Sequence, residues 1–144
     1  MSLVIVDANV LLYATNPGDR HHELSRAWLD EQLSTSEPLG FAWLVIVAFL
    51  RIATHPGVSA RPMSSAEAGK RVSQWLGQPA ATIVEPTSRH LSVLLGLLST
   101  TGTGGNAVPD AHLAALAVEH DAALASFDHS FQRFRGVRLM LPGG

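Results

Sequence analysis

The sequence contains no cysteine, which excludes disulfide bonds and thiolate metal sites. It also lacks a long apolar run, because Asp7 interrupts the first apolar segment and no later segment reaches the length of a membrane span. The first residues do not include the basic region that begins a secretory signal. From these absences we expect a soluble, cytoplasmic protein without a membrane partner.

Charged residues are also scarce. They make up 15% of the chain and leave a formal net charge of −2, which argues against a domain that coats nucleic acid by bulk electrostatic attraction. The charge does not exclude an enzyme that contacts a few phosphates. Most of the cationic residues are arginines, which suit bidentate phosphate contacts. The apolar fraction of 47% indicates either a well-filled α/β core or an apolar surface for a partner.

Strand-like segments alternate with helical ones along a single domain, residues 1–144. We predict strands at 3–6, 38–42, 81–86, 121–128 and 137–141. We predict helices at 9–15, 21–33, 43–54, 64–76, 88–101 and 107–120, and a short helical turn at 130–134. Because strands that alternate with helices need crossover connections, this pattern predicts an α/β fold, a three-layer α/β/α sandwich with a mostly parallel central sheet.

Three of the twelve acidic residues differ from the others in their position. Asp7 follows the first strand, Asp128 ends the strand at 121–128, and Asp110 lies in the first turn of an apolar helix. Ligands of open parallel sheets bind at the carboxyl ends of the strands, where the strand order reverses, so we expect the three carboxylates to meet in one cleft. The structural alternative is that each of them only caps a helix or opens a turn.

Three carboxylates in one cleft repel one another unless a cation compensates their charge. A few carboxylates together with water and substrate phosphate are the ligands that Mg²⁺ prefers. The hypothesis is therefore a divalent metal site that activates a water molecule for attack on a phosphate. Both one-ion and two-ion sites are compatible with the pattern.

The other conspicuous polar residues favour ordinary roles. Most of the remaining acids are expected at solvated positions. These acids are Asp19, Glu23, Asp30, Glu31, Glu37, Glu67 and Glu119. His112 and His129 lie close to Asp110 and Asp128 in sequence, and surface or capping roles are expected for both. For the arginines near the last strand, Arg133, Arg135 and Arg138, a solvated edge is favoured over a phosphate contact.

Three segments of the chain resemble the PIN-domain ribonucleases, and more narrowly the VapC-like toxins of type II toxin–antitoxin pairs: IVDANVLLYA, GNAVPDAHLAALAVEH and DAALASFDHSF. The resemblance covers nearly the whole chain and implies a compact PIN-like α/β/α sandwich that cleaves RNA with the help of Mg²⁺ or Mn²⁺. Matched residue by residue, Asp7, Asp110 and Asp128 take the acidic positions of the family, and Asn9 takes the polar position that follows the first of them.

The chain departs from the family pattern at two positions. Ala48 stands where many relatives carry Glu, and Ser130 stands where a second acid often follows the last Asp. Asn9, Asn106 or a water molecule are candidates to fill the gap, and Arg51 is a candidate for a phosphate contact. The departures keep a second function open, in which a weakened PIN-like site binds an antitoxin or RNA without cleaving it.

The resemblance also implies partners. They are an RNA substrate, a small antitoxin protein that enters an apolar groove near the helices at 21–33 and 43–54, and a second copy of the chain in a homodimer.

Overall fold

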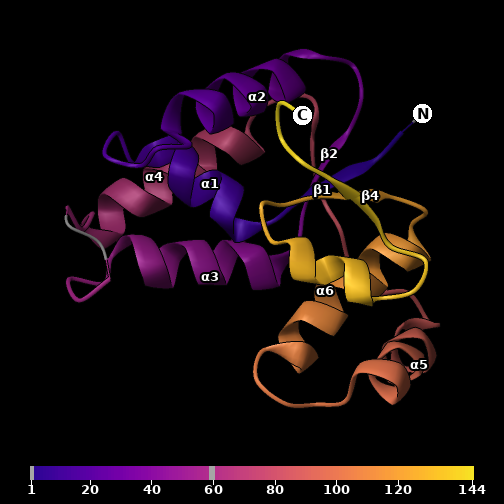
Figure 1. The fold of residues 1–144 in the computed structure, drawn as a ribbon. Coiled ribbons are helices and arrows are strands. Elements are labelled where there is room, and N and C mark those ends of the chain that lie inside the picture. Colours follow the sequence, from indigo (N-terminus) through magenta and orange to yellow (C-terminus); the bar gives the residue numbers. More distant parts are fainter. Residues whose placement is uncertain (1, 59–60) are drawn as a thin grey trace.

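The computed structural model describes residues 2–58 and 61–144 and shows an α/β fold built on one five-stranded sheet (Figure 1). The strands are β1 (Val4–Val6), β2 (Leu39–Phe41), β3 (Ala81–Ile83), β4 (Ala123–Ala125) and β5 (Arg138–Met140). Their order in the sheet is β3-β2-β1-β4-β5, and each neighbouring pair is parallel. The predicted α/β class with a mostly parallel sheet is confirmed.

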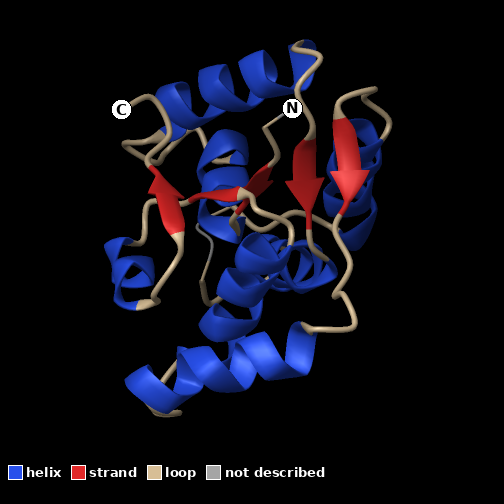
Figure 2. Cartoon of the chain, turned by 90° about the vertical axis from the view of Figure 1, so that its right-hand side faces the viewer, coloured by secondary structure: helices blue, strands red, loops and turns tan. Residues whose placement is uncertain are grey.

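The helices are α1 (Ala8–Thr15), α2 (His22–Ser34), α3 (Trp43–Ala53), α4 (Ser65–Leu76), α5 (His90–Thr101) and α6 (Ala107–Glu119), with a short 3₁₀ helix η1 (His129–Arg133). The chain moves in one direction across the sheet from β1 to β3 and in the other from β3 to β5. Because crossovers between parallel strands are right-handed, helices that serve opposite directions cover opposite faces. Figure 1 shows α1 to α4 grouped apart from α5 and α6, and Figure 2 shows the strands in a row between helices.

The strands are short and apolar because both faces of the sheet are covered. Ile5, Val6, Leu39 and Leu124 have no exposed surface, and full burial of such side chains stabilises a fold by about 1.5–3 kcal/mol each. Gly40 is required in β2 by close packing, since a Cβ there would lie 2.6 Å from Cγ2 of Val84.

Two helix starts show how side-chain hydrogen bonds, local in one case and long-range in the other, set the element boundaries. The predicted capping signature of α4 is confirmed, because the Ser64 hydroxyl accepts from the Glu67 amide and the Glu67 carboxylate accepts from the Ser64 amide. Helix α5 begins at His90, later than the start predicted near residue 88. The reason is that the backbone N–H and hydroxyl of Thr87 donate to the Glu119 carboxylate, which holds the preceding residues outside the helix.

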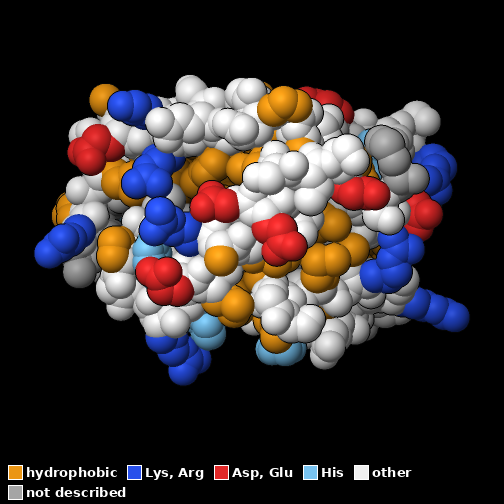
Figure 3. All heavy atoms as spheres, turned by 90° about the horizontal axis from the view of Figure 1, so that it is seen from above, with side chains coloured by type: hydrophobic (Ala, Val, Ile, Leu, Met, Phe, Trp, Pro, Cys, Tyr) orange, Lys and Arg blue, Asp and Glu red, His pale blue; other side chains and the backbone are white. Residues whose placement is uncertain are grey.

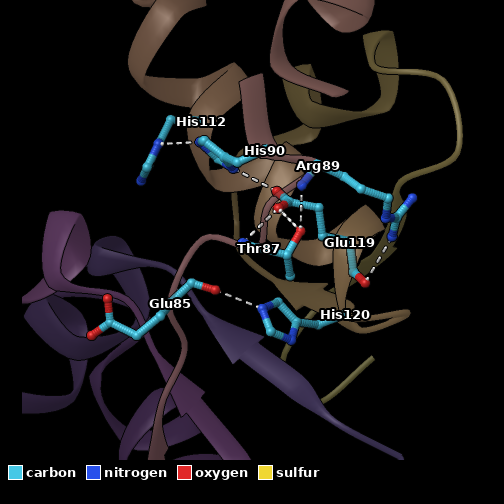
Figure 4. Close-up of polar contacts among 7 residues, drawn as sticks. All are labelled: Glu85, Thr87, Arg89, His90, His112, Glu119 and His120. Atoms are coloured by element: carbon cyan, nitrogen blue, oxygen red, sulfur yellow. Dashed lines mark hydrogen bonds and ion pairs between the residues drawn. The ribbon is translucent and has the colours of Figure 1, made fainter. Parts of the chain in front are cut away.

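A buried polar cluster joins α5 to α6 and corrects the expectation for Glu119 (Figure 4). The Glu119 side chain has no exposed surface, whereas a solvated position was expected. Thr87 donates to its Oε1 and His90 Nδ1 lies 2.5 Å from its Oε2. Burial raises the pKa of the Glu119 carboxyl, but these hydrogen bonds and the His90 charge lower it by more, so the pKa lies below its ordinary value.

The expectation for His112 is corrected in the same cluster. Its Nδ1 lies 2.9 Å from Nε2 of His90, which in turn contacts Glu119 (Figure 4). His112 therefore belongs to a hydrogen-bonded network and does not have a surface or capping role. Burial lowers the pKa of His112, the neighbouring His90 lowers it further, and the charge of Glu119 opposes both effects. The cluster therefore fixes α5 against the helix that carries Asp110.

The strand order reverses between β1 and β4, because the chain leaves β1 toward β2 and leaves β4 toward β5. The backbone N–H of Asp7 donates to the Ala125 carbonyl at 2.9 Å and extends the pairing of the two strands. The ends of β1 and β4 are therefore adjacent, at the place where open parallel sheets bind ligands.

The surface in view over α2 has no single basic patch: acidic and basic side chains are interspersed among apolar ones (Figure 3). This agrees with the formal net charge of −2. No helix within residues 2–58 and 61–144 combines the length and apolar character needed to cross a membrane.

Candidate functional site

Asp7 is the first residue after β1 and the N-cap of α1. Its Oδ1 accepts a 2.7 Å hydrogen bond from the Ala8 amide, and its Oδ2 accepts a 2.7 Å hydrogen bond from the Ser126 hydroxyl. Asp7 therefore does cap helix α1, but only its Oδ1 takes part in the cap. The second oxygen connects Asp7 to the end of β4.

Ser126 is a functional candidate that the sequence reasoning missed. It follows β4, is fully buried, and uses its hydroxyl three times: it donates to Asp7, and it accepts from Nδ2 of Asn9 and from the Asp128 amide, both at 3.0 Å. The sequence feature that could have identified it is a serine between the apolar residues Ala125 and Phe127 at a strand end. A polar atom that is buried at such a position needs hydrogen-bond partners.

Asn9 also connects the ends of β1 and β4. Its amide nitrogen donates to Ser126 and, at 3.5 Å, lies at the limit of a bond to Asp7 Oδ2. Its Oδ1 accepts from the Phe127 amide at 3.3 Å. The structure thus brings Asn9 together with Asp7, and the contacts of Asn9 orient the segment that leads to Asp128.

Asp128 caps the 3₁₀ helix η1, where its Oδ1 accepts from the Ser130 amide at 2.9 Å. The predicted turn-opening role is therefore present. Its backbone N–H is held by Ser126, which also holds Asp7. Two of the three predicted aspartates are in this way connected through one hydroxyl.

Asp110 reaches the site from the first turn of α6, and Arg133 pairs with it: Nη2 of Arg133 lies 3.1 Å from Oδ2 of Asp110. Arg133 is exposed, as expected of a solvated edge, and it also forms this ion pair with Asp110. The arginine comes from η1, so the pair connects α6 to the segment capped by Asp128.

Asp7 and Asp110 line one pocket between α1, α3 and α6. Ala48 and Arg51 of α3 line the same pocket. Ala48, the position where the resemblance leads one to expect Glu, thus lines the same pocket as the two aspartates. Arg51, the residue expected to contact a phosphate, lines this pocket too. Asn106 differs, since its side chain is exposed and forms no hydrogen bond with any described residue.

The pKa of the Asp7 carboxyl depends on its burial, its hydrogen bonds and the charges of the other two aspartates. Burial raises the pKa of the Asp7 carboxyl above its ordinary value. The hydrogen bonds from Ser126 and Ala8 lower it by less, and the negative charges of Asp110 and Asp128 raise it further. The charges of Asp110 and Asp128 therefore both act on Asp7, and a bound cation would relieve this repulsion.

Within residues 2–58 and 61–144, no three His, Asp or Glu side chains are close enough to form a complete metal-binding group. The donor chemistry still fits a divalent ion that keeps much of its water. Oδ1 of Asp110 and Oδ2 of Asp128 accept no hydrogen bond from the described residues, and Asp7 Oδ2 faces only uncharged donors. Mg²⁺ is typically bound through one or two carboxylates and several waters.

The chain is similar over nearly its full length to named bacterial ribonucleases. It is 52% identical over 134 residues to Ribonuclease VapC37 of Mycobacterium tuberculosis, covering 93% of both chains. It is 36% identical over 136 residues to Ribonuclease VapC33 of the same species, covering 94% of this chain and 95% of the relative.

Solved structures share the fold at low sequence identity. VapBC2 from Rickettsia felis, crystallised with a DNA fragment of its promoter, matches with a TM-score of 0.69 at 18% identity, over 96% of this chain and 97% of the other. DNA-bound VapBC from Salmonella typhimurium matches with a TM-score of 0.66 at 15% identity, over 97% and 98%. The PIN domain family model matches residues 4–137. The chain therefore belongs to the PIN domain family.

Proposed function

We propose that this protein is a divalent-metal-dependent RNA endonuclease and the toxin of a toxin–antitoxin pair. The observation that carries the proposal is the placement of Asp7 and Asp128 at the point where strand order reverses, with Asp110 lining the same pocket as Asp7. The relatives named as VapC ribonucleases support the activity.

Asp7, Asp110 and Asp128 are the residues that would hold Mg²⁺ or Mn²⁺. When bound there, the ion would supply positive charge to stabilise the phosphoryl group in the transition state and to favour ionisation of an attacking water. Ser126 and Asn9 orient Asp7 and the segment of Asp128 by the hydrogen bonds described above. Arg51 lines the pocket of Asp7 and Asp110, which supports a role for it in contacting a phosphate of the RNA.

An antitoxin partner is supported by the structural neighbours, which are VapBC proteins. Helix α3 exposes Trp43, Leu44 and Val47, with exposed fractions of 52%, 37% and 58%. Large exposed apolar side chains on one helix are typical of a surface that a partner covers. We propose that this surface contributes to contacts with an antitoxin or with the second copy of a homodimer.

The proposal is tested with the purified chain and total cellular RNA, incubated with MgCl₂ or with EDTA, followed by sequencing of the RNA 5′ ends. We expect new 5′-phosphate ends at discrete positions with Mg²⁺ and none with EDTA. Asp7→Asn and Asp110→Asn should abolish these ends.

Asp121→Asn is the matched control, because Asp121 is 91% exposed in its side chain and has a φ of 50°, a conformation that asparagine tolerates well. It should cleave as the wild type does. Equal cleavage by Asp7→Asn would contradict the proposal. RNA binding without metal-dependent ends would favour the second function, a PIN-like protein that binds without cleaving.

A further inference from the structure

Three contacts fix the guanidinium of Arg133. Its Nη2 donates to Oδ2 of Asp110 at 3.1 Å, and its Nη1 donates to the Ser130 carbonyl at 2.8 Å. Its carbon Cζ lies 4.4 Å from the centre of the Phe134 ring, within the range of a cation–π contact. Because Phe134 is 2% exposed, the arginine rests on a fixed part of the core.

A second Arg–Asp pair in the same chain provides a comparison. Arg138 and Asp121 are 3.0 Å apart, but their side chains are 60% and 91% exposed. Arg133 and Asp110 are 32% and 22% exposed at almost the same distance. Water screens the first pair more strongly than the second, so the charge of Arg133 acts more effectively on its neighbours.

Arg133 also connects the parts of the site. Its carbonyl partner, Ser130, belongs to the helix that Asp128 caps, and its carboxylate partner, Asp110, lines the pocket with Asp7. The arginine therefore bridges the segment of Asp128 to that of Asp110. Its positive charge offsets part of the charge that the three aspartates bring together.

We infer that Arg133 is an internal counter-cation of the acidic site: it holds Asp110 through one oxygen in the metal-free protein, and its charge opposes the binding of a divalent cation. The inference rests on the proposed function, since it concerns the same three aspartates. Arg133 is in this sense a positioning residue whose presence sets the metal affinity of the site.

The test is a calorimetric titration of Mn²⁺ into the wild type, Arg133→Gln and Arg138→Gln at one ionic strength. Removal of a cation close to the site should make Arg133→Gln bind Mn²⁺ about tenfold more tightly. Arg138→Gln removes the same charge from an exposed pair and should bind as the wild type does. Arg133→Lys, which keeps the charge, should also stay close to the wild-type affinity.

Unchanged or weaker Mn²⁺ binding by Arg133→Gln would overturn the inference while leaving the proposed function intact. Absence of Mn²⁺ binding by the wild type would overturn both. A readout without metal comes from the melting temperatures of Arg133→Gln, Asp110→Asn and the double variant. We expect the double variant to lose less than the two single losses added together, and strict additivity would contradict the inference.

Discussion

The hydroxyl of Ser126 donates a 2.7 Å hydrogen bond to Oδ2 of Asp7, and the Ser126 Oγ accepts a 3.0 Å hydrogen bond from the backbone N–H of Asp128. One fully buried side chain thus sets the relative position of the acids that follow β1 and β4. Because the strand order reverses between these two strands, the geometry of the candidate site depends on a residue that is not itself acidic.

Ser126→Ala should therefore weaken both the fold and the activity. The backbone N–H of Asp128 and the side-chain amide of Asn9 both lose a buried acceptor. This loss should lower the free energy of unfolding by about 1–3 kcal/mol. Urea denaturation and the RNA cleavage rate measure the two effects. Ser130→Ala is the control, since Ser130 is exposed and its contacts use its backbone atoms. Equal losses in both variants would contradict the role assigned to Ser126.

Asp7 should make the stability of the metal-free protein depend on pH. Burial chiefly raises its pKa in the folded state, so just above the ordinary pKa of Asp the folded chain binds a proton that the unfolded chain has already released. The free energy of unfolding then falls as pH rises through this interval. Asp7→Asn removes this contribution.

The measurement is urea denaturation of the wild type and Asp7→Asn in EDTA between about pH 4 and 7. The difference in the free energy of unfolding should shift in favour of Asp7→Asn as pH rises. A difference that stays constant across this range would show that Asp7 ionises in the folded protein as it does in the unfolded chain.

Glu119 should contribute in the opposite sense. Although burial raises its pKa, the bonds from Thr87 and His90 lower it by more, so its contribution to stability is present above the ordinary pKa of Glu and is lost as pH falls through the lower folded value. Glu119→Gln leaves buried donors with a weaker acceptor and should lower the free energy of unfolding at neutral pH by about 2–4 kcal/mol.

Glu23→Gln is the matched control for Glu119→Gln, because the Glu23 side chain is 89% exposed. Its effect should stay within about 0.5 kcal/mol. Thermal or urea denaturation at neutral pH compares the two variants, and a similar small effect for both would contradict the buried role of Glu119.

Ala48→Glu should strengthen metal binding. Ala48 lines the pocket together with Asp7 and Asp110, so a carboxylate at this position adds a ligand oxygen on the side of α3. Calorimetric titration with Mn²⁺ should show about tenfold tighter binding, equivalent to about 1.4 kcal/mol. Ala48→Gln has nearly the same shape without the charge, and binding by Ala48→Glu that is no tighter than by Ala48→Gln would contradict the expectation.

Elements and strand ends could be predicted because they depend on local patterns. The short apolar strands, the Ser64–Glu67 capping box and the position of Asp7 after β1 all follow from residues adjacent in sequence. The adjacency of Asp7 and Asp128 followed from one general rule about parallel sheets and not from any contact visible in the sequence.

Two side chains were placed wrongly for a common reason. Glu119 ends an apolar helix, where a charged residue is normally solvated, but Thr87 and His90 from a distant segment enclose it. His112 was expected at the surface or in a cap, but His90, 22 residues away, contacts it in the same cluster. Such pairings depend on how elements pack, and a single sequence does not encode them as a pattern.

Anomalous diffraction from crystals of the protein soaked in Mn²⁺ locates the ion directly. We predict a peak at the carboxyl ends of β1 and β4, bound to carboxylate oxygens of Asp7 and Asp110 directly or through one water, with Asp128 beside them. A protein that binds Mn²⁺ with its peak away from these three residues, or one that shows no peak at saturating Mn²⁺, would contradict it.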